Sequence, residues 1–256
     1  MNAPFKQAPV KGADIQSLCR AIKAIPGRGH KPFAKFLFNT LRACMAAEFI
    51  QRKQEVFLNV PLWRALGAEE AQSSEIEAVV NATRVYLALV LESPAFTDVL
   101  CEAHAHLLAR GDGDGLGQYF TPPDVADLAA VLAVDQVARY PPKKAPGEPF
   151  RIHEPACGAG SLLLGHLRSM PRGWLLPEVV IEAIDIDPMC CAMTTLQFVA
   201  NSLLHNKRLQ QVRVWCGNTL LPPEELMEFA VLELKTEAQA EAITWAKIDE
   251  RIRWCV

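Results

Sequence analysis

The stretch RIHEPACGAGS, from Arg151 to Ser161, decides the fold of this chain. Phe150 and Ile152 alternate with polar residues as in a short strand, and Glu154-Pro155 ends it because proline has no N–H for a strand ladder. Cys157-Gly158-Ala159-Gly160 is a tight turn of small residues, after which a helix begins. Glycines at such a turn let the backbone approach a ligand, and the helix N-terminus offers unpaired N–H groups. The stretch therefore predicts a nucleoside-type cofactor site, with a ligand-free tight turn as the alternative.

The segments on either side of this stretch alternate between helix and strand. The apolar spacing predicts a helix before it, with Val125, Leu128, Ala129 and Leu132 on the buried side. The β-branched run VVIEAID is the clearest strand in the sequence. Strand, helix, strand, helix, strand is the order of the cofactor-binding half of a doubly wound α/β sheet, so the predicted fold class is α/β with a partial, Rossmann-like sheet. The expected elements are helices at 124–139, 161–170 and 188–206 and strands at 150–154, 179–185 and 211–216.

The part of the chain that precedes this pattern is helical by its periodicity. GDGDGLG, at 111–117, separates the two parts with four glycines in seven residues. We therefore predict a helical N-terminal domain at 1–114 and a cofactor-binding domain at 115–256. The expected N-terminal helices cover 13–25, 32–54, 74–92 and a segment that Ser93-Pro94 opens and that ends near Arg110.

Composition and charge limit the class of protein. The chain has 256 residues and no uninterrupted apolar run of transmembrane length, and its eight cysteines show neither a CxxC pair nor zinc spacing. A cytoplasmic, reduced protein without a membrane segment or a structural metal is expected. Residues 1–64 hold eleven Lys/Arg and three Asp/Glu, whereas the formal net charge of the whole chain is −3. This basic quarter is either a surface for nucleic-acid phosphates or an ordinary solvated helical face.

Two motifs in a fixed order carry a family resemblance. GQYFTP at 117–122, followed by EPACGAG at 154–160, resembles the adenine-specific (N-6) DNA methyltransferases, and most of all the modification subunits of type I restriction systems. The resemblance covers about residues 115–220. It implies S-adenosylmethionine as cofactor, DNA as a partner and a helical region before the methyltransferase-like domain. A protein partner or a homo-oligomer that completes the sheet is also expected.

The resemblance assigns roles to residues in both motifs. The FTP loop would lie over the methionine part of the cofactor, and Glu154 would lie near the methionine amino group, although Glu154 could also be a turn-stabilising acid. Phe120 could equally be a core residue. The candidate cofactor-binding residues of the two motifs are Tyr119, Phe120, Thr121, Glu154, Ala156, Cys157, Gly158 and Gly160.

Two further candidates follow predicted strands. Asp185 ends the second strand of the pattern, at the carboxyl edge where such sheets bind ligands, and an acid there can accept both ribose hydroxyls. Asp187 is the alternative, but its place before Pro188 suits a helix cap better. Asn218 lies where the family has an acid that contacts the adenine amino group; its alternative role is that of a turn residue.

The catalytic residues are not identified by the resemblance. The family has Asn-Pro-Pro-aromatic after a fourth strand, and this tetrapeptide does not occur here. A fourth strand at 229–234 would bring Lys235-Thr236-Glu237 to the catalytic position, but a long helix from Pro223 is favoured because proline suits a first helical turn. His104 and His106 are read as ordinary histidines, since positions i and i+2 do not face each other on a helix.

Three functions are compatible with these observations. The first is an adenine-N6 DNA methyltransferase that uses S-adenosylmethionine, completed by a partner chain. The second is a non-catalytic cofactor-binding or DNA-associated regulatory module derived from that family, and the missing tetrapeptide favours it. The third is a methyltransferase that acts on another substrate, for which the sequence offers no positive feature.

Overall fold

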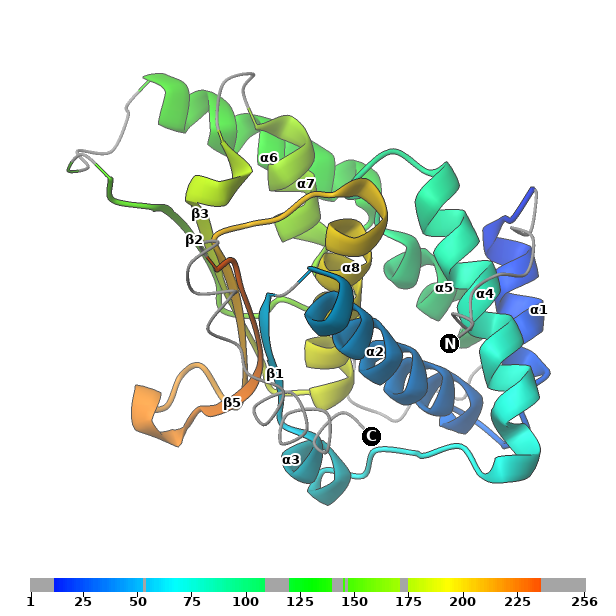
Figure 1. Ribbon diagram of the computed structural model, residues 1–256. Helices are drawn as coiled ribbons and strands as arrows, with labels where there is room; N and C mark the ends of the chain where they lie inside the picture. Colours follow the sequence, from blue (N-terminus) through cyan, green and yellow to red (C-terminus); the bar gives the residue numbers. More distant parts are fainter. Residues whose placement is uncertain are drawn as a thin grey trace.

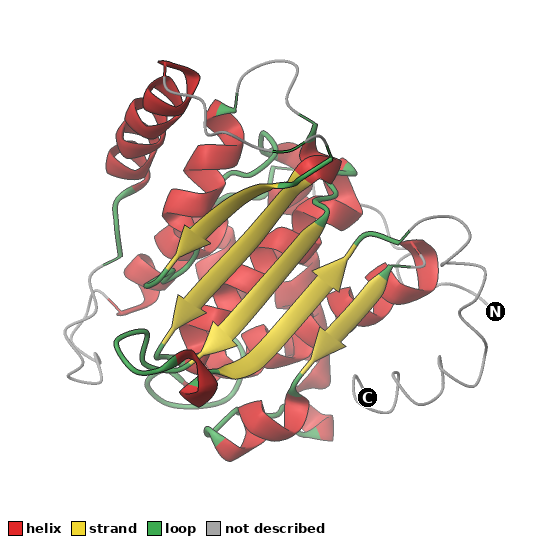
Figure 2. Ribbon diagram, turned by 90° about the vertical axis from the view of Figure 1, so that its left-hand side faces the viewer, coloured by secondary structure: helices red, strands yellow, loops and turns green. Residues whose placement is uncertain are grey.

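A five-stranded mixed sheet forms the centre of the fold, with helices packed against one of its faces (Figures 1 and 2). The computed structural model describes residues 12–52, 54–108, 120–139, 145, 147–170 and 175–235. The strands follow the order β1-β5-β4-β3-β2 across the sheet. Their bounds are Glu55–Leu58 (β1), Phe150–Glu154 (β2), Val179–Asp185 (β3), Gln211–Cys216 (β4) and Met227–Glu233 (β5).

The parallel part of the sheet confirms the predicted α/β fold class. β2, β3 and β4 are parallel neighbours, connected by α7 (Ser161–Ser169) and α8 (Pro188–His205). Ile152 lies opposite Ile181, which in turn lies opposite Val212, so one apolar row crosses the three strands. The carboxyl ends of the strands therefore share one edge, where the turns after β2, β3 and β4 meet.

The expectation of a long helix from Pro223 is wrong. Only the short 3-10 turn Pro223–Glu225 is helical there, and β5 follows it as an antiparallel partner of both β4 and β1. Two flanking strands offer β5 a complete ladder and bury its apolar centre from Phe229 to Leu232, which outweighs the local helix propensity of its Glu and Leu residues. The sheet thus continues one strand beyond the three that the sequence predicted, and β1, which the sequence did not predict, forms its far edge.

Three N-terminal helices lie within two residues of the predicted ones at 13–25, 32–54 and 74–92, the short helix Val60–Ala65 was not predicted, and α5 starts later than predicted. That helix begins at Val99 instead of Ser93-Pro94, and the carboxylate of Asp98 accepts a hydrogen bond from the N–H of Cys101 in its first turn. Phe96, in the segment before it, has a left-handed backbone with a φ of 65°. The bounds are Ile15–Lys23 (α1), Lys31–Arg52 (α2), Val60–Ala65 (α3), Ile76–Glu92 (α4) and Val99–Leu108 (α5), with short 3-10 turns at Ser73–Glu75 and Leu176–Glu178.

Helix α6 (Pro123–Arg139) begins one residue before its predicted start and buries a different face from the one predicted. Ala126 and Ala130 are its fully buried residues, whereas Leu128 and Leu132 are each 61% exposed. α6 packs against α7, where a Cβ on Gly165 would lie 3.1 Å from the carbonyl oxygen of Ala126. Such a close approach of the two backbones requires small residues on both helices. The prediction that Val125, Leu128 and Leu132 lie on the buried side is therefore wrong.

One hydrophobic core extends through both predicted domains. It runs from Leu18 on α1 to Leu232 on β5, and α8 lies at its centre between the sheet and α2. The opposite face of the sheet carries polar side chains, among them Glu182, which forms ion pairs with Arg151 and His153. Figure 2 looks onto this face, and no α-helix of the described chain crosses it. The predicted boundary at 114 lies outside the described residues and stays a prediction.

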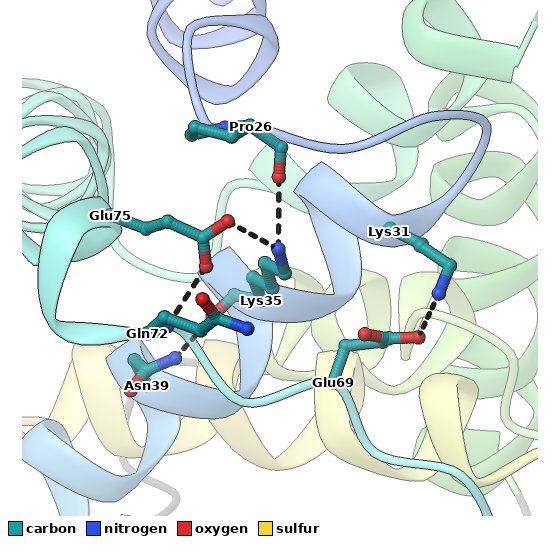
Figure 3. A network of polar contacts seen from close by, with 7 residues as sticks. All are labelled: Pro26, Lys31, Lys35, Asn39, Glu69, Gln72 and Glu75. Carbon is teal, nitrogen blue, oxygen red and sulfur yellow. Dashed lines mark hydrogen bonds and ion pairs between the residues drawn. The ribbon is translucent and has the colours of Figure 1, made fainter.

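Part of the basic charge of residues 1–64 is paired with acids from the 69–75 segment. Lys35, buried on α2, donates to the carbonyl of Pro26 at 3.0 Å and to the carboxylate of Glu75 at 2.7 Å (Figure 3). Lys31 forms an ion pair with Glu69 at 3.0 Å, and Arg64 pairs with Glu70. Three of the eleven positive charges of residues 1–64 are thus balanced locally. No helix in the described part of the chain is long and apolar enough to span a bilayer.

Candidate cofactor-binding site

The glycine turn lies against the carboxyl end of β3. The N–H of Cys157 donates to the carbonyl of Ile184 at 2.8 Å, and the N–H of Gly160 closes the turn on the carbonyl of Cys157 at 2.7 Å. Gly158 and Gly160 have φ values of +53° and +90°, which side chains disfavour. The turn thus presents its backbone, and the N-terminus of α7, at the edge where the parallel strands end.

Polar side chains from α8 fix this turn from behind. Thr194 donates to the carbonyl of Gly158 at 2.9 Å, and the amide nitrogen of Gln197 donates to the carbonyl of Ala159 at 2.7 Å. The same amide donates to the carboxylate of Asp98, which also accepts from the hydroxyl of Ser161. Because these groups are buried and hydrogen-bonded, the turn is held in one conformation before any ligand arrives.

Phe120 of the FTP motif covers the glycine turn. A Cβ on Gly158 would lie 3.1 Å from the Phe120 ring, so the ring rests directly on the glycine. His104 on α5 contacts the same ring edge to face, with ring centroids 4.8 Å apart. The thiol of Cys101, one turn earlier, donates to the carbonyl of Thr121 at 3.8 Å. Helix α5 thereby holds the Phe120–Thr121 segment over the turn.

Asp185 joins the glycine turn to the end of β3. One of its carboxylate oxygens accepts the N–H of Gly158 at 2.8 Å, and the other accepts the N–H of Asp187 at 2.9 Å. Burial raises the pKa of this carboxyl, which the two backbone donors partly oppose. Asp187 instead caps α8, where its carboxylate accepts the N–H of Met189 at 2.8 Å. Because each carboxylate oxygen can accept two hydrogen bonds, Asp185 keeps capacity for two hydroxyl donors.

Glu154 and Asn218 lie at the ends of the neighbouring strands. The Glu154 carboxylate accepts the N–H of Ala156 at 3.3 Å, and burial raises its pKa. The Asn218 amide oxygen accepts the N–H of Leu220 at 3.0 Å, which is an ordinary turn contact. The preceding Gly217 donates its N–H to the carbonyl of Asp185 at 2.9 Å, so the turn after β4 lies beside that after β3. The structure thus places all three acceptor side chains at one edge.

The lysine considered for the catalytic position is far from this edge. β5 runs antiparallel to β4, with Met227 opposite Cys216 and Glu233 opposite Gln211, so its end lies at the amino edge of the parallel strands. Lys235 forms ion pairs there with Glu55 at 2.6 Å and with Glu233 at 3.0 Å. The placement of Lys235 at the catalytic position is therefore wrong. Tyr119, Thr236 and Glu237 lie outside the described residues.

Sequence reasoning did not identify four residues of the site. Thr194 and Gln197 are polar, buried and three residues apart on a helix that is buried from Cys190 to Ser202, a pattern that could have indicated them. His104 has no comparable signal, because only the tertiary fold brings it to Phe120. Ile186, 68% exposed next to Asp185, could have been noticed as an apolar residue between two acids.

A comparison with protein families agrees with the motifs. The family model of N-6 DNA methylases matches residues 96–243. A Listeria monocytogenes protein assigned to the class I S-adenosylmethionine-dependent methyltransferases has 15% sequence identity and a TM-score of 0.37, over 74% of this chain and 54% of its own. The methyltransferase subunit of a Streptococcus thermophilus type I restriction-modification system has 16% identity and a TM-score of 0.37, over 86% of this chain and 42% of its own. The chain thus spans about half of the length of these two proteins, and no curated protein matches it.

Proposed function

This chain belongs to the N-6 DNA methylase family, and from that premise we propose that it binds S-adenosylmethionine at the turn between β2 and α7. One observation carries the proposal: Asp185, Gly158 and Phe120, which come from separate parts of the chain, meet at a single edge of the sheet. The pieces of a nucleoside site are an acid for ribose hydroxyls, an open backbone turn and an apolar cover.

Each piece of the site suits one part of the proposed cofactor. The two oxygens of Asp185 can accept the two ribose hydroxyls. Ile186 and Leu220, exposed by 68% and 88%, offer apolar surface for the adenine ring beside Asn218. Phe120 and Glu154 lie where the methionine side would be held, and the raised pKa of Glu154 indicates a partly dehydrated carboxyl. Cys157, whose thiol pKa burial raises strongly, serves as packing and not as a nucleophile.

The first test is calorimetry of the purified chain with S-adenosylmethionine. One binding site is expected, and Asp185→Ala should weaken it by about 1.5–3 kcal/mol, the range for hydrogen bonds to a charged group. Glu182→Ala is the matched control, because Glu182 lies on the same strand but faces the polar side of the sheet. Unchanged binding in Asp185→Ala would remove Asp185 from the site.

The family acts on adenine in DNA, and we propose duplex DNA as the partner of this chain. The three ion pairs of Lys31, Lys35 and Arg64 reduce the positive charge that residues 1–64 can offer to phosphates. The salt dependence of DNA affinity should accordingly correspond to fewer contacts than the eleven basic residues suggest. A salt series on mixed-sequence duplex DNA measures this number as its slope, and a slope of zero would contradict phosphate contacts.

We propose that this chain alone transfers methyl groups slowly. A slow rate is what the second candidate function, a non-catalytic cofactor-binding module, requires. Transfer requires hydrogen-bond acceptors that hold the adenine amino group in line with the methyl group. The sequence has no Asn-Pro-Pro-aromatic tetrapeptide, and Lys235 lies at the other edge of the sheet. A tritiated-methyl assay on duplex DNA should give little incorporation. Robust incorporation that Asp185→Ala abolishes would contradict this and favour Asn218 as an acceptor.

A further inference from the structure

The side-chain amide of Gln197 is buried where α8, α5 and the glycine turn meet. Gln197 is 2% exposed, and its nitrogen donates to the carbonyl of Ala159 at 2.7 Å and to the carboxylate of Asp98 at 2.9 Å. Its oxygen accepts the N–H groups of Val99 at 3.0 Å and of Leu100 at 3.3 Å. An amide has two donors and two acceptor positions, so the whole capacity of this side chain is used. One residue thus bonds both to the glycine turn and to the start of α5.

The bonds to α5 satisfy backbone groups that the helix itself cannot satisfy. The first N–H groups of an α-helix have no acceptor within the helix, and α5 begins at Val99. Gln197 supplies the acceptor for Val99 and Leu100, and Asp98 supplies the acceptor for Cys101. Val99 and Leu100 are buried, so the loss of their shared acceptor would leave both N–H groups without water in its place. Gln197 therefore fixes where α5 begins against α8.

Helix α5 passes this placement on to the segment that covers the glycine turn. His104 contacts the ring of Phe120 edge to face, and the thiol of Cys101 donates to the carbonyl of Thr121. Both contacts come from the first two turns of α5, next to the N–H groups that Gln197 accepts. The amide of Gln197 hence connects the turn with its cover, directly on one side and through α5 on the other.

The part of the site proposed for the nucleoside is held by other bonds. The carboxylate of Asp185 accepts the N–H of Gly158 at 2.8 Å, and the hydroxyl of Thr194 donates to the carbonyl of Gly158 at 2.9 Å. These bonds do not involve Gln197 or α5. Removal of the Gln197 amide should therefore loosen α5 and the cover, while the turn stays on the end of β3.

We propose that Gln197 is a positioning residue that gives the site its preference for the whole cofactor over the nucleoside alone. The inference rests on the proposed binding of S-adenosylmethionine, in which Phe120 and Glu154 hold the methionine side and Asp185 holds the ribose. Gln197 acts through the placement of Phe120, because a binding group held in position before the ligand arrives loses less freedom on binding. Its amide should matter more for S-adenosylmethionine than for adenosine, which lacks the methionine side.

Calorimetry of the whole chain with S-adenosylmethionine and with adenosine tests the proposal. Gln197→Met keeps the length of the side chain and removes its four hydrogen bonds. The affinity for S-adenosylmethionine should fall about tenfold or more, and that for adenosine less than about threefold.

Asn201→Leu is the matched control for this substitution. Asn201 is an equally buried amide one turn later on α8, and its side chain bonds to the N–H of Phe96 at 2.6 Å and to the carbonyl of Gln197 at 2.8 Å. Both substitutions remove a buried amide, so both should lower the melting temperature. Only Gln197→Met should change the ratio of the two affinities, which a loss of stability alone does not alter.

A conservative variant and a measurement without ligand complete the test. Gln197→Glu keeps the oxygen that accepts from α5, and beside the Asp98 carboxylate the new carboxyl holds a proton that it can donate. This variant should keep the preference for S-adenosylmethionine within about threefold, so it tests the proposal even where Gln197→Met does not fold. In hydrogen exchange of the free chain, the N–H groups of Val99 and Leu100 should exchange on the order of tenfold faster in Gln197→Met and unchanged in Asn201→Leu.

The outcomes separate the inference from the proposed function. Equal losses of the two affinities in Gln197→Met would overturn the inference alone, as would a lost preference in Asn201→Leu or in Gln197→Glu. Unchanged exchange at Val99 and Leu100 in Gln197→Met would overturn the anchoring of α5, and with it the inference. An unchanged chain that binds neither ligand would overturn the proposed function together with the inference.

Discussion

Replacing Gly158 by alanine probes the contact on which the site is built. Two costs are expected. A non-glycine residue at a φ of +53° costs about 1–2 kcal/mol, and the new Cβ would lie 3.1 and 3.2 Å from two carbons of the Phe120 ring. Because His104 on α5 also contacts that ring, the ring cannot shift freely, and overpacking of this kind costs about 1–3 kcal/mol more. Gly158→Ala should therefore lower the free energy of unfolding by about 2–5 kcal/mol.

A second glycine separates the two costs. Gly29 has a φ of +59° and nothing within 4 Å of its added Cβ, so Gly29→Ala measures the backbone cost alone. Urea denaturation of both variants gives the contact cost as their difference. Phe120→Leu in the Gly158→Ala background should remove most of that difference, which a double-mutant cycle reports as coupling. Equal losses for the two glycines, or zero coupling between Gly158 and Phe120, would refute the stacking of Phe120 on the turn.

Three further predictions concern single side chains. Burial raises the pKa of Glu154 above its ordinary 4.5, so the folded state favours the neutral acid. Glu154→Gln should therefore raise the free energy of unfolding at pH 7. In a series of urea denaturation curves at different pH values, this gain should vanish below about pH 4.5. Burial lowers the pKa of His104 below 6.5, although the Asp187 carboxylate opposes this shift, so the stability from neutral His104 is present above pH 6.5 and lost as the pH falls. His104→Phe keeps the aromatic contact with Phe120 and should abolish this part of the loss of stability in acid. A pH profile of stability that the substitution leaves unchanged would contradict the prediction. Lys235→Ala should lower the melting temperature, because it removes the cation that Glu55 and Glu233 share. The cofactor affinity measured by calorimetry should stay unchanged. Weaker binding would place Lys235 nearer the site than the direction of β5 allows.

The parts of the site that the sequence could indicate are those encoded locally. Gly158 and Gly160 are needed for positive φ, and Asp185 ends a strand of β-branched, apolar composition, so all three could be located from the sequence. Local patterns also placed α6, but periodicity shows only that a helix has an apolar side. Which side is buried was decided by the fit of Ala126 and Ala130 against Gly165, a property of two helices together.

What could not be predicted depends on distant partners. The residues of β5 favour a helix by themselves, and only the vacant position between β4 and β1 makes them a strand. The alternative of a fourth strand at 229–234 misplaced Lys235 for another reason: β5 runs antiparallel to β4, and the direction of a strand fixes the edge at which its last residue lies. His104 reached the site through the packing of α5 against the rest of the chain, for which the sequence around it gives no signal.

The pairing of β1 with β5 has a consequence for synthesis on the ribosome. Asn59, which follows β1, bonds to the carbonyl of Glu228, 169 residues later in the chain. At about 5–20 residues per second, β1 emerges roughly 8–35 s before its partner exists. During that interval Val56 and Leu58, which are buried in the finished sheet, have no strand to pair with. A nascent chain stalled before residue 227 should therefore engage chaperones through β1, and one extended well past residue 233 should release them.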